Sequence, residues 1–128
     1  MANTFKVVNF AAEPNSSGTP YIVYTAPSTP TTTTIVLGLI LSNIHTSQVT
    51  ATVRLVSDTS ARGGALSSGA NTVANGTSII IQDAPIPVGS SLELMAGNKV
   101  VIESTDQITI DCSVADKLSG TLSIMEIT

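Results

Sequence analysis

The chain contains few side chains that could take part in catalysis. His45 is its only histidine and Cys112 its only cysteine. A Ser–His–acid triad needs an activated nucleophile, which hydrolases often place on a strained GxSxG turn, and the sequence has no such turn. We therefore expect His45 to be a solvated turn residue or an interface contact. The sequence predicts no catalytic residue and no enzymatic activity.

The histidine, cysteine and acidic residues also do not predict a metal site or a catalytic pair of carboxylates. One histidine and one cysteine cannot complete a tetrahedral zinc site. Asp106, Asp111 and Asp116 recur every five residues, but a calcium site draws several oxygens from one loop, and strand alternation separates Asp106 from Asp111. Glu93 and Glu103 alternate outward, which favours plain surface charges over a glycosidase pair. We expect no metal site and no cofactor.

The composition argues against several classes of partner. The net charge is −4 and the five basic residues are scattered, so no basic patch is expected to meet a nucleic-acid backbone. Aromatic residues make up 3% of the chain and tryptophan is absent, which leaves no platform on which bases or sugar rings could stack. The longest apolar run, Ile35–Leu41, is strand-length and far short of the roughly 18 residues of a membrane helix. We expect no nucleic-acid partner and no membrane partner.

The low charge instead indicates a protein that buries part of its surface in an assembly. Charged residues form 11% of the chain, against about 25% in average soluble domains. Serine and threonine fill the solvent-side positions, and such a weakly charged surface is poorly suited to a lone monomer. We therefore expect a homo-oligomer. The first 18 residues lack the apolar stretch of a secretory signal, so we expect synthesis in a cytoplasm.

Alternating apolar and polar side chains predict strands along most of the chain. Between residues 108 and 114 the apolar side chains lie on one face, whereas Thr109, Asp111 and Ser113 lie on a face expected to be wet. Cys112 belongs to the dry face, which predicts a small buried hydrophobe with a shielded thiol. No segment resembles a helix long enough to connect parallel strands.

The spacing of these segments predicts the fold. We expect an all-β protein, an antiparallel β-sandwich of the jelly-roll type with about eight or nine strands, forming one domain over residues 1–128. The strands 32–43 and 48–57 are predicted to form a hairpin, and Gly38 to mark a bulge or a close backbone approach. The expected core consists of Val53, Leu55, Ile80, Leu92, Leu94, Ile102, Ile108, Ile110, Cys112, Leu122 and Ile124.

Two segments are candidates for contacts between subunits. Residues 1–20 combine a short N-terminal strand with a loop, and residues 58–77 form a long stretch of small and polar residues. A connection of this length is either a flexible surface loop or an arm that another subunit orders. Both segments hold few apolar side chains, so we expect them to recover their ordering entropy from a neighbour rather than from their own domain.

Five motifs together resemble the plan of small virion proteins of tailed bacteriophages. They are an entry strand ending in Tyr24–Pro27, a threonine-rich strand at Thr32–Asn43, a PIPVGSSLEL turn at Pro85–Leu94, a hairpin at Lys99–Ile108 and a closing strand at Leu118–Ile127. The similarity covers most of the chain outside residues 58–77. These motifs describe a scaffold and carry no chemistry.

The resemblance implies a non-catalytic structural protein of a virion. Within this group we expect a capsid decoration, or cement, protein: a jelly-roll homotrimer that binds across capsomers, with the major capsid protein as its partner. A weakly charged surface rich in serine and threonine is compatible with that role. The alternative is a tail, neck, baseplate or fibre-attachment component of the same kind of particle. In either case the expected location is the virion, after synthesis in the host cytoplasm.

Overall fold

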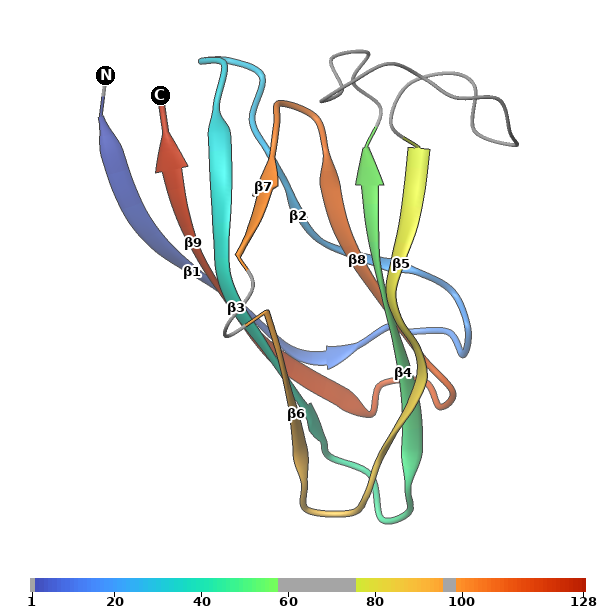
Figure 1. Ribbon diagram of the computed structural model, residues 1–128. Helices are drawn as coiled ribbons and strands as arrows, with labels where there is room; N and C mark the ends of the chain where they lie inside the picture. Colours follow the sequence, from blue (N-terminus) through green and yellow to red (C-terminus); the bar gives the residue numbers. More distant parts are fainter. Residues whose placement is uncertain (1, 58–75, 96–98) are drawn as a thin grey trace.

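The computed structural model describes residues 2–57, 76–95 and 99–128, and these residues form nine strands and no helix. Figure 1 shows them coloured along the sequence. The strands are β1 (Asn3–Glu13), β2 (Tyr21–Thr25), β3 (Thr33–Asn43), β4 (Val49–Ser57), β5 (Gly76–Ile86), β6 (Ser91–Leu94), β7 (Val100–Ile102), β8 (Gln107–Cys112) and β9 (Leu118–Ile127).

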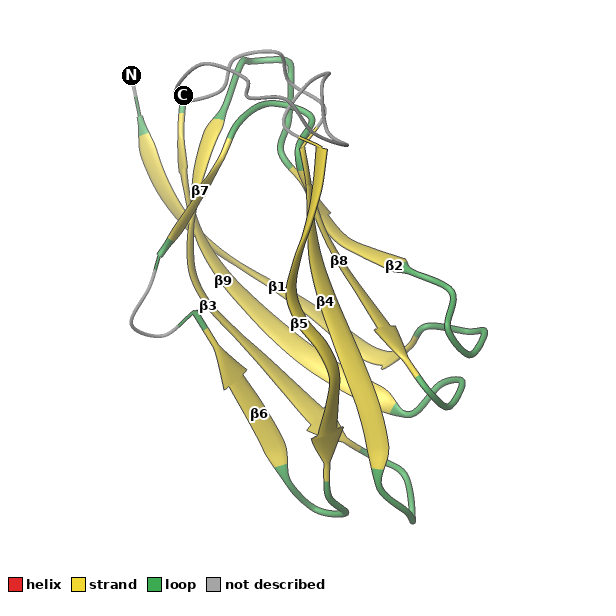
Figure 2. Ribbon diagram, turned by 45° about the vertical axis from the view of Figure 1, so that its right-hand side comes forward, coloured by secondary structure: helices red, strands yellow, loops and turns green. Residues whose placement is uncertain are grey.

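The strands form two antiparallel sheets that pack face to face (Figure 2). The five-stranded sheet has the order β1-β9-β3-β6, and β7 also pairs with β3. The four-stranded sheet has the order β2-β8-β4-β5. This order is that of a jelly roll, in which β6 and β7 together occupy the place of one strand beside β3. The predicted antiparallel sandwich is confirmed.

The predicted hairpin between the third and fourth strands is wrong. β3 lies between β9 and the β6–β7 pair in one sheet, whereas β4 lies between β8 and β5 in the other. The residues between them therefore form an arch from one sheet to the other. β7 and β8 are separated in the same way, so the hairpin expected at Lys99–Ile108 is also an arch. A hairpin and an arch both satisfy the same alternation, because each strand buries one face in either case.

The core fills the space between the sheets and agrees with the sequence prediction. Val53, Ile102 and Cys112 are fully buried, and Leu55 and Leu94 pack against the core while remaining partly exposed. The cluster also contains apolar residues that the prediction omitted: Phe10, Val23, Ala26, Val36, Leu39, Leu41, Val49, Ala51, Ile86 and Leu118.

The outer face of β8 is not wet, contrary to the expectation from its alternation. Thr109 is 4% exposed and Asp111 is 9% exposed, although both point away from the core. β8 is an inner strand, flanked by β2 and β4. Arg54 on β4 lies next to it, and its guanidinium forms an ion pair with the Asp111 carboxylate. Side chains from the flanking strands therefore cover this face.

Two glycines shape the five-stranded sheet. At Gly38 the register of β3 against β9 shifts, which confirms the predicted bulge. Gly120 on β9 lies opposite Phe10 on β1, and a Cβ atom at this position would stand 2.4 Å from Phe10 Cζ. The Phe10 ring packs over Gly120 and also meets the Tyr21 ring, with centroids 5.5 Å apart. The ring thereby joins β1 to the other sheet.

Of the two segments expected to act as contact arms, the structure describes the N-terminal one in full from residue 2 and only the last two residues of the other. Residues 3–13 form β1, which pairs along its length with β9 and buries Phe10 in the core. The expectation that this segment folds only against a neighbour is therefore wrong. Residues 58–75 of the other segment lie outside the described residues, and Gly76 and Thr77 begin β5.

Candidate functional site: the outer face of the five-stranded sheet

The residues that could have formed a catalytic centre lie in separate places. His45 is in the connection between β3 and β4, where its backbone N–H donates to Asn43 Oδ1 at 2.7 Å. Glu93 lies on the outer face of β6 and Glu103 in the turn after β7. Cys112 is a free cysteine and fully buried, as predicted. Among the described residues, no nucleophile, base and acid converge.

The three aspartates that recur every five residues have different partners and do not converge on one site. Asp106 is buried, and its carboxylate accepts bonds from Ser57 Oγ and the Glu103 N–H, each at 3.0 Å. Asp111 on β8 forms an ion pair with Arg54 on β4. Asp116 is exposed in the turn before β9, where its N–H donates to the Pro14 carbonyl. Within the described part of the chain, no group of histidine, cysteine and acidic residues could hold a metal ion.

A buried polar cluster joins the two sheets near the chain termini. Tyr24 on β2 donates to Glu126 Oε2 at 2.6 Å, and Thr34 on β3 bonds to the Tyr24 oxygen at 2.8 Å. Lys6 on β1 reaches the other carboxylate oxygen of Glu126 at 2.7 Å. Because the tyrosine hydroxyl has one proton and gives it to Glu126, Thr34 is the donor in the second bond.

The charges in this cluster are fixed by its contacts. The bonds from Lys6 and Tyr24 lower the pKa of Glu126, so that the carboxylate remains ionised. Burial and the neighbouring carboxylate raise the pKa of Tyr24 to about 12. The carboxylate has used both oxygens, and the phenol stays protonated over the ordinary pH range. The cluster therefore holds the sheets together and has no free acid or base.

The outer face of the five-stranded sheet has a different character, because it is apolar and exposed. Phe5 on β1 pairs with Met125 on β9, Met125 with Ile35 on β3, and Ile35 with Val101 on β7. Cross-strand partners share a face, so these side chains form one row across four strands. Phe5 is 72% exposed and Val101 61%. We call this set of four residues the apolar row.

Two further exposed apolar side chains lie on the same face as the apolar row. Val7 on β1 is 60% exposed and Ile40 on β3 is 41% exposed, both on the same face. Over the part of this sheet that the structure describes, Glu93 is the one charged side chain at an outward strand position. Monomeric proteins rarely expose a large contiguous apolar patch unless it serves an interaction.

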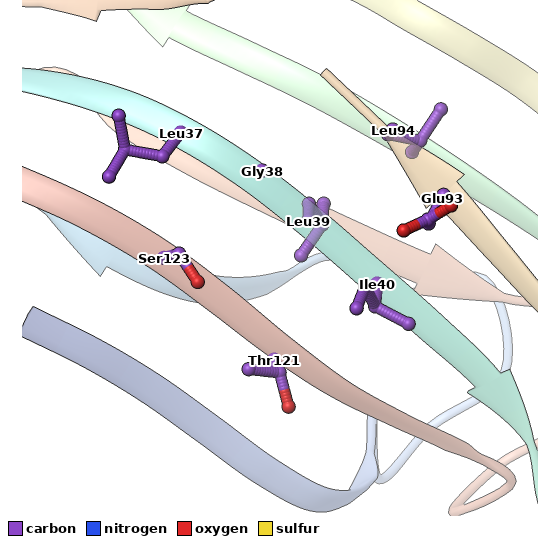
Figure 3. Close-up of a pocket in the computed structure, with 8 residues that line it drawn as sticks. All are labelled: Leu37, Gly38, Leu39, Ile40, Glu93, Leu94, Thr121 and Ser123. Carbon is purple, nitrogen blue, oxygen red and sulfur yellow. The ribbon is translucent and has the colours of Figure 1, made fainter. Parts of the chain in front are cut away.

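A shallow hollow of about 290 Å³ adjoins the apolar row (Figure 3). It lies where the strand next to β3 changes from β6, which pairs with Leu39–Ser42, to β7, which pairs with Thr34–Val36. The hollow offers one carboxylate and two hydroxyl groups, which is no basis for acid–base catalysis. Its lining residues are Leu37, Gly38, Leu39, Ile40, Glu93, Leu94, Thr121 and Ser123.

This face was not predicted from the sequence. Its residues come from four strands, and side-chain alternation within each strand does not give the order of the strands in the sheet. One feature of the sequence could have indicated this face. In residues 5–10, apolar side chains occupy both faces of a single strand. A strand that is apolar on both faces is either central in a protein or covered by a partner.

Comparisons with known proteins give a structural similarity but no sequence match. No protein-family model matches it, and no curated protein sequence matches it. Among solved structures, a chain of the Bacillus endospore appendages, a family of disulfide-linked pili, is similar with a TM-score of 0.45 and 16% sequence identity. That alignment covers 99% of this chain and 87% of the other. The described residues include no helix that could cross a membrane.

Proposed function

We propose that the protein is a non-catalytic structural subunit of a tailed-bacteriophage particle and that it stabilises the head as a capsid decoration protein. The observation that carries this proposal is the apolar row, which leaves Phe5 and Val101 largely exposed on a rigid sheet. The resemblance of five sequence motifs to those of small virion proteins supports this kind of particle. The proposed partner is the major capsid protein.

The physical character of the outer face suits a contact repeated many times. β-Ladders hold the backbone of the sheet in place, so docking costs little backbone conformational entropy. The near absence of charge means that the contact depends on apolar burial rather than on ion pairs. One such contact is weak, but an oligomer that engages several capsomers binds far more tightly than each subunit alone.

A decoration protein of this kind stabilises the shell by mass action. A protein that binds the assembled shell but not the separated capsomers shifts the equilibrium toward the shell. Internal pressure must then break the added contacts as well as those between capsomers. The proposed role requires no chemistry, which agrees with the separation of His45, Cys112 and the acidic residues in the structure.

The proposal is tested with particles made with and without the protein. Particles that lack it should assemble and package DNA but release the DNA at lower temperature or lower salt, and added purified protein should restore their resistance. Particles that retain DNA normally but have no tail, or fail to adsorb, would instead indicate the tail, neck, baseplate or fibre-attachment alternative.

A matched pair of variants tests the surface that carries the proposal. Val101→Lys places a charge in the apolar row, whereas Val88→Lys places one in the turn between β5 and β6, at a residue of similar exposure (61% and 55%). Burying an unpaired charge in an interface is costly, so Val101→Lys should lose binding to particles. Val88→Lys should bind as the wild type does. Equal binding by both variants would remove the apolar row from the contact.

A further inference from the structure

The strands at the sheet edges differ in how well they are protected from pairing with another chain. Exposed edges are normally short, bulged or interrupted by proline. Among the described strands, β6 and β7 have four and three residues. β2 has five residues and a bulge, and β5 has two register shifts and carries Pro85. Four of the five edge strands thus carry such a device.

β1 is the least protected of the five. It has eleven residues, contains no proline, and pairs with β9 in unbroken register from Asn3 to Phe10, so that its one register shift lies beyond Phe10 at the end of the strand. Its other side borders no strand in the described structure, and Figure 1 shows it at the outer edge of the sheet. A long regular edge of this kind presents unpaired backbone groups that another strand can bind.

The hydrogen-bonding pattern identifies which residues of β1 face the free edge. Ala2 and Thr128 exchange both backbone bonds. Antiparallel pairs alternate between those that exchange bonds and those that do not. Thr4, Lys6 and the following even positions therefore bond to β9, and the N–H and C=O groups of the odd positions point outward. The residues at the odd positions are Asn3, Phe5, Val7 and Asn9.

These same odd positions carry the exposed apolar side chains of the outer face. Phe5 is 72% exposed and Val7 is 60% exposed, and neither Asn3 nor Asn9 bears a charge. One strand therefore offers free donors, free acceptors and apolar side chains at the same residues. A strand added at this edge would satisfy the backbone groups and bury part of both side chains.

We propose that the occupant of this edge is β1 of a second copy, which pairs with it in antiparallel orientation about a two-fold axis. The charge pattern favours a copy of the same strand, because no edge-facing residue would meet a like charge. It also excludes one register, and the regular stretch of β1 favours another. Pairing centred on Lys6 would place two ammonium groups opposite each other, which destabilises a sheet. Pairing centred on Val7 sets Lys6 opposite Val8 and keeps the overlap from Asn3 to Ala11 within β1.

The pairing joins two five-stranded sheets into one continuous sheet. Because paired residues of antiparallel strands project to the same side, the two apolar rows come to lie on one surface. The dimer then presents twice the apolar face of one chain to any partner. This two-fold contact differs from the three-fold symmetry expected from the resemblance, and it does not depend on the proposed role in a particle.

Sedimentation of variants at the edge tests the pairing. The wild type should sediment as a dimer. Val7→Pro removes an edge-facing N–H that does not bond to β9, so the variant should fold and sediment as a monomer. Val7→Lys keeps the N–H but sets two lysines opposite each other and should also be monomeric, which covers a folding failure of the proline variant. Asn9→Lys faces Phe5 in this register, so it should remain dimeric, as should Val101→Lys at the far edge.

Cross-linking tests the register itself. Residues of a hydrogen-bonded pair have Cα atoms about 5.5 Å apart, a distance that a disulfide spans. Val7→Cys should therefore form covalent dimers on mild oxidation, whereas Val101→Cys should not, and the buried Cys112 is shielded in both. A monomeric or trimeric wild type, a folded Val7→Pro variant that stays dimeric, or equal cross-linking by the two cysteine variants would overturn the proposal. Since the measurements use the purified protein, their failure is distinct from a failure to find the protein on particles.

Discussion

The hydroxyl of Tyr24 donates a hydrogen bond of 2.6 Å to the carboxylate of Glu126, and this bond joins β2 of one sheet to β9 of the other. The two residues are 102 positions apart in the chain. Glu126 is only 6% exposed, and its other carboxylate oxygen forms an ion pair with Lys6. The bond thus satisfies a buried carboxylate and at the same time connects the two layers of the sandwich.

Removing this hydroxyl should weaken the fold without changing it. Tyr24→Phe removes the hydrogen bond to one oxygen of the buried Glu126 carboxylate. A loss of this kind typically lowers the free energy of unfolding by about 1–3 kcal/mol. The free energy of unfolding in urea should fall by that amount. Tyr21→Phe is the matched control, because its hydroxyl makes no hydrogen bond to the described residues, and it should be near neutral. An equal effect of the two substitutions would show that the bond is not formed.

Acid should destabilise the protein partly through Glu126. The bonds from Lys6 and Tyr24 hold its pKa below the ordinary value of 4.5. A carboxylate with a lowered folded pKa adds stability that is fully present above the unfolded pKa and is lost as the pH falls through the folded pKa. The free energy of unfolding should therefore decline below about pH 4.5, and Glu126→Gln should reduce that decline. If the variant and the wild type lose stability in parallel on acidification, Glu126 does not contribute.

Gly120 should tolerate no side chain. An alanine Cβ would stand 2.4 Å from the Phe10 ring and 3.1 Å from the Ile40 carbonyl, so the ring would have to leave its place against Tyr21. Overpacking of this kind costs about 1–3 kcal/mol, measured as a lower midpoint of thermal or urea unfolding. Gly38→Ala is the control, since its nearest neighbour would be 3.9 Å away. A loss no greater than that of the control would contradict the packing at Gly120.

Cys112 should react slowly with thiol reagents in the folded protein. Its side chain is fully buried between the sheets, and a reagent can reach it only after local or global opening. Labelling followed by mass spectrometry should show little modification under native conditions and complete modification in denaturant. Val101→Cys, on the exposed end of the apolar row, supplies the comparison and should label at once. Equally fast native labelling at both positions would place Cys112 at the surface.

The strands and part of the core could be predicted from the sequence, because alternation reports which side of a strand is buried. Val53, Ile110 and Leu122 follow that rule, and all three are fully buried. The rule could not tell a hairpin from an arch at residues 44–48, since it says nothing about which strand lies beside which. It also could not choose between the two faces of β1, where apolar residues occupy both.

The apolar row was the hardest feature to predict for the same reason. The apolar row takes one residue from each of four strands, and only the sheet order brings Phe5, Met125, Ile35 and Val101 together. The bond between Tyr24 and Glu126 likewise depends on the packing of two sheets. Patterns within one strand carry no information on either arrangement.

The most direct test of the proposed function is a reconstruction of the particle at a resolution that shows strands. We predict density for this jelly roll on the outside of the head, with the outer face of the five-stranded sheet, marked by Phe5 and Val101, turned toward the capsid shell. Density for the protein in the tail, neck or baseplate, or on the head with that face turned to solvent and uncovered, would contradict the proposal.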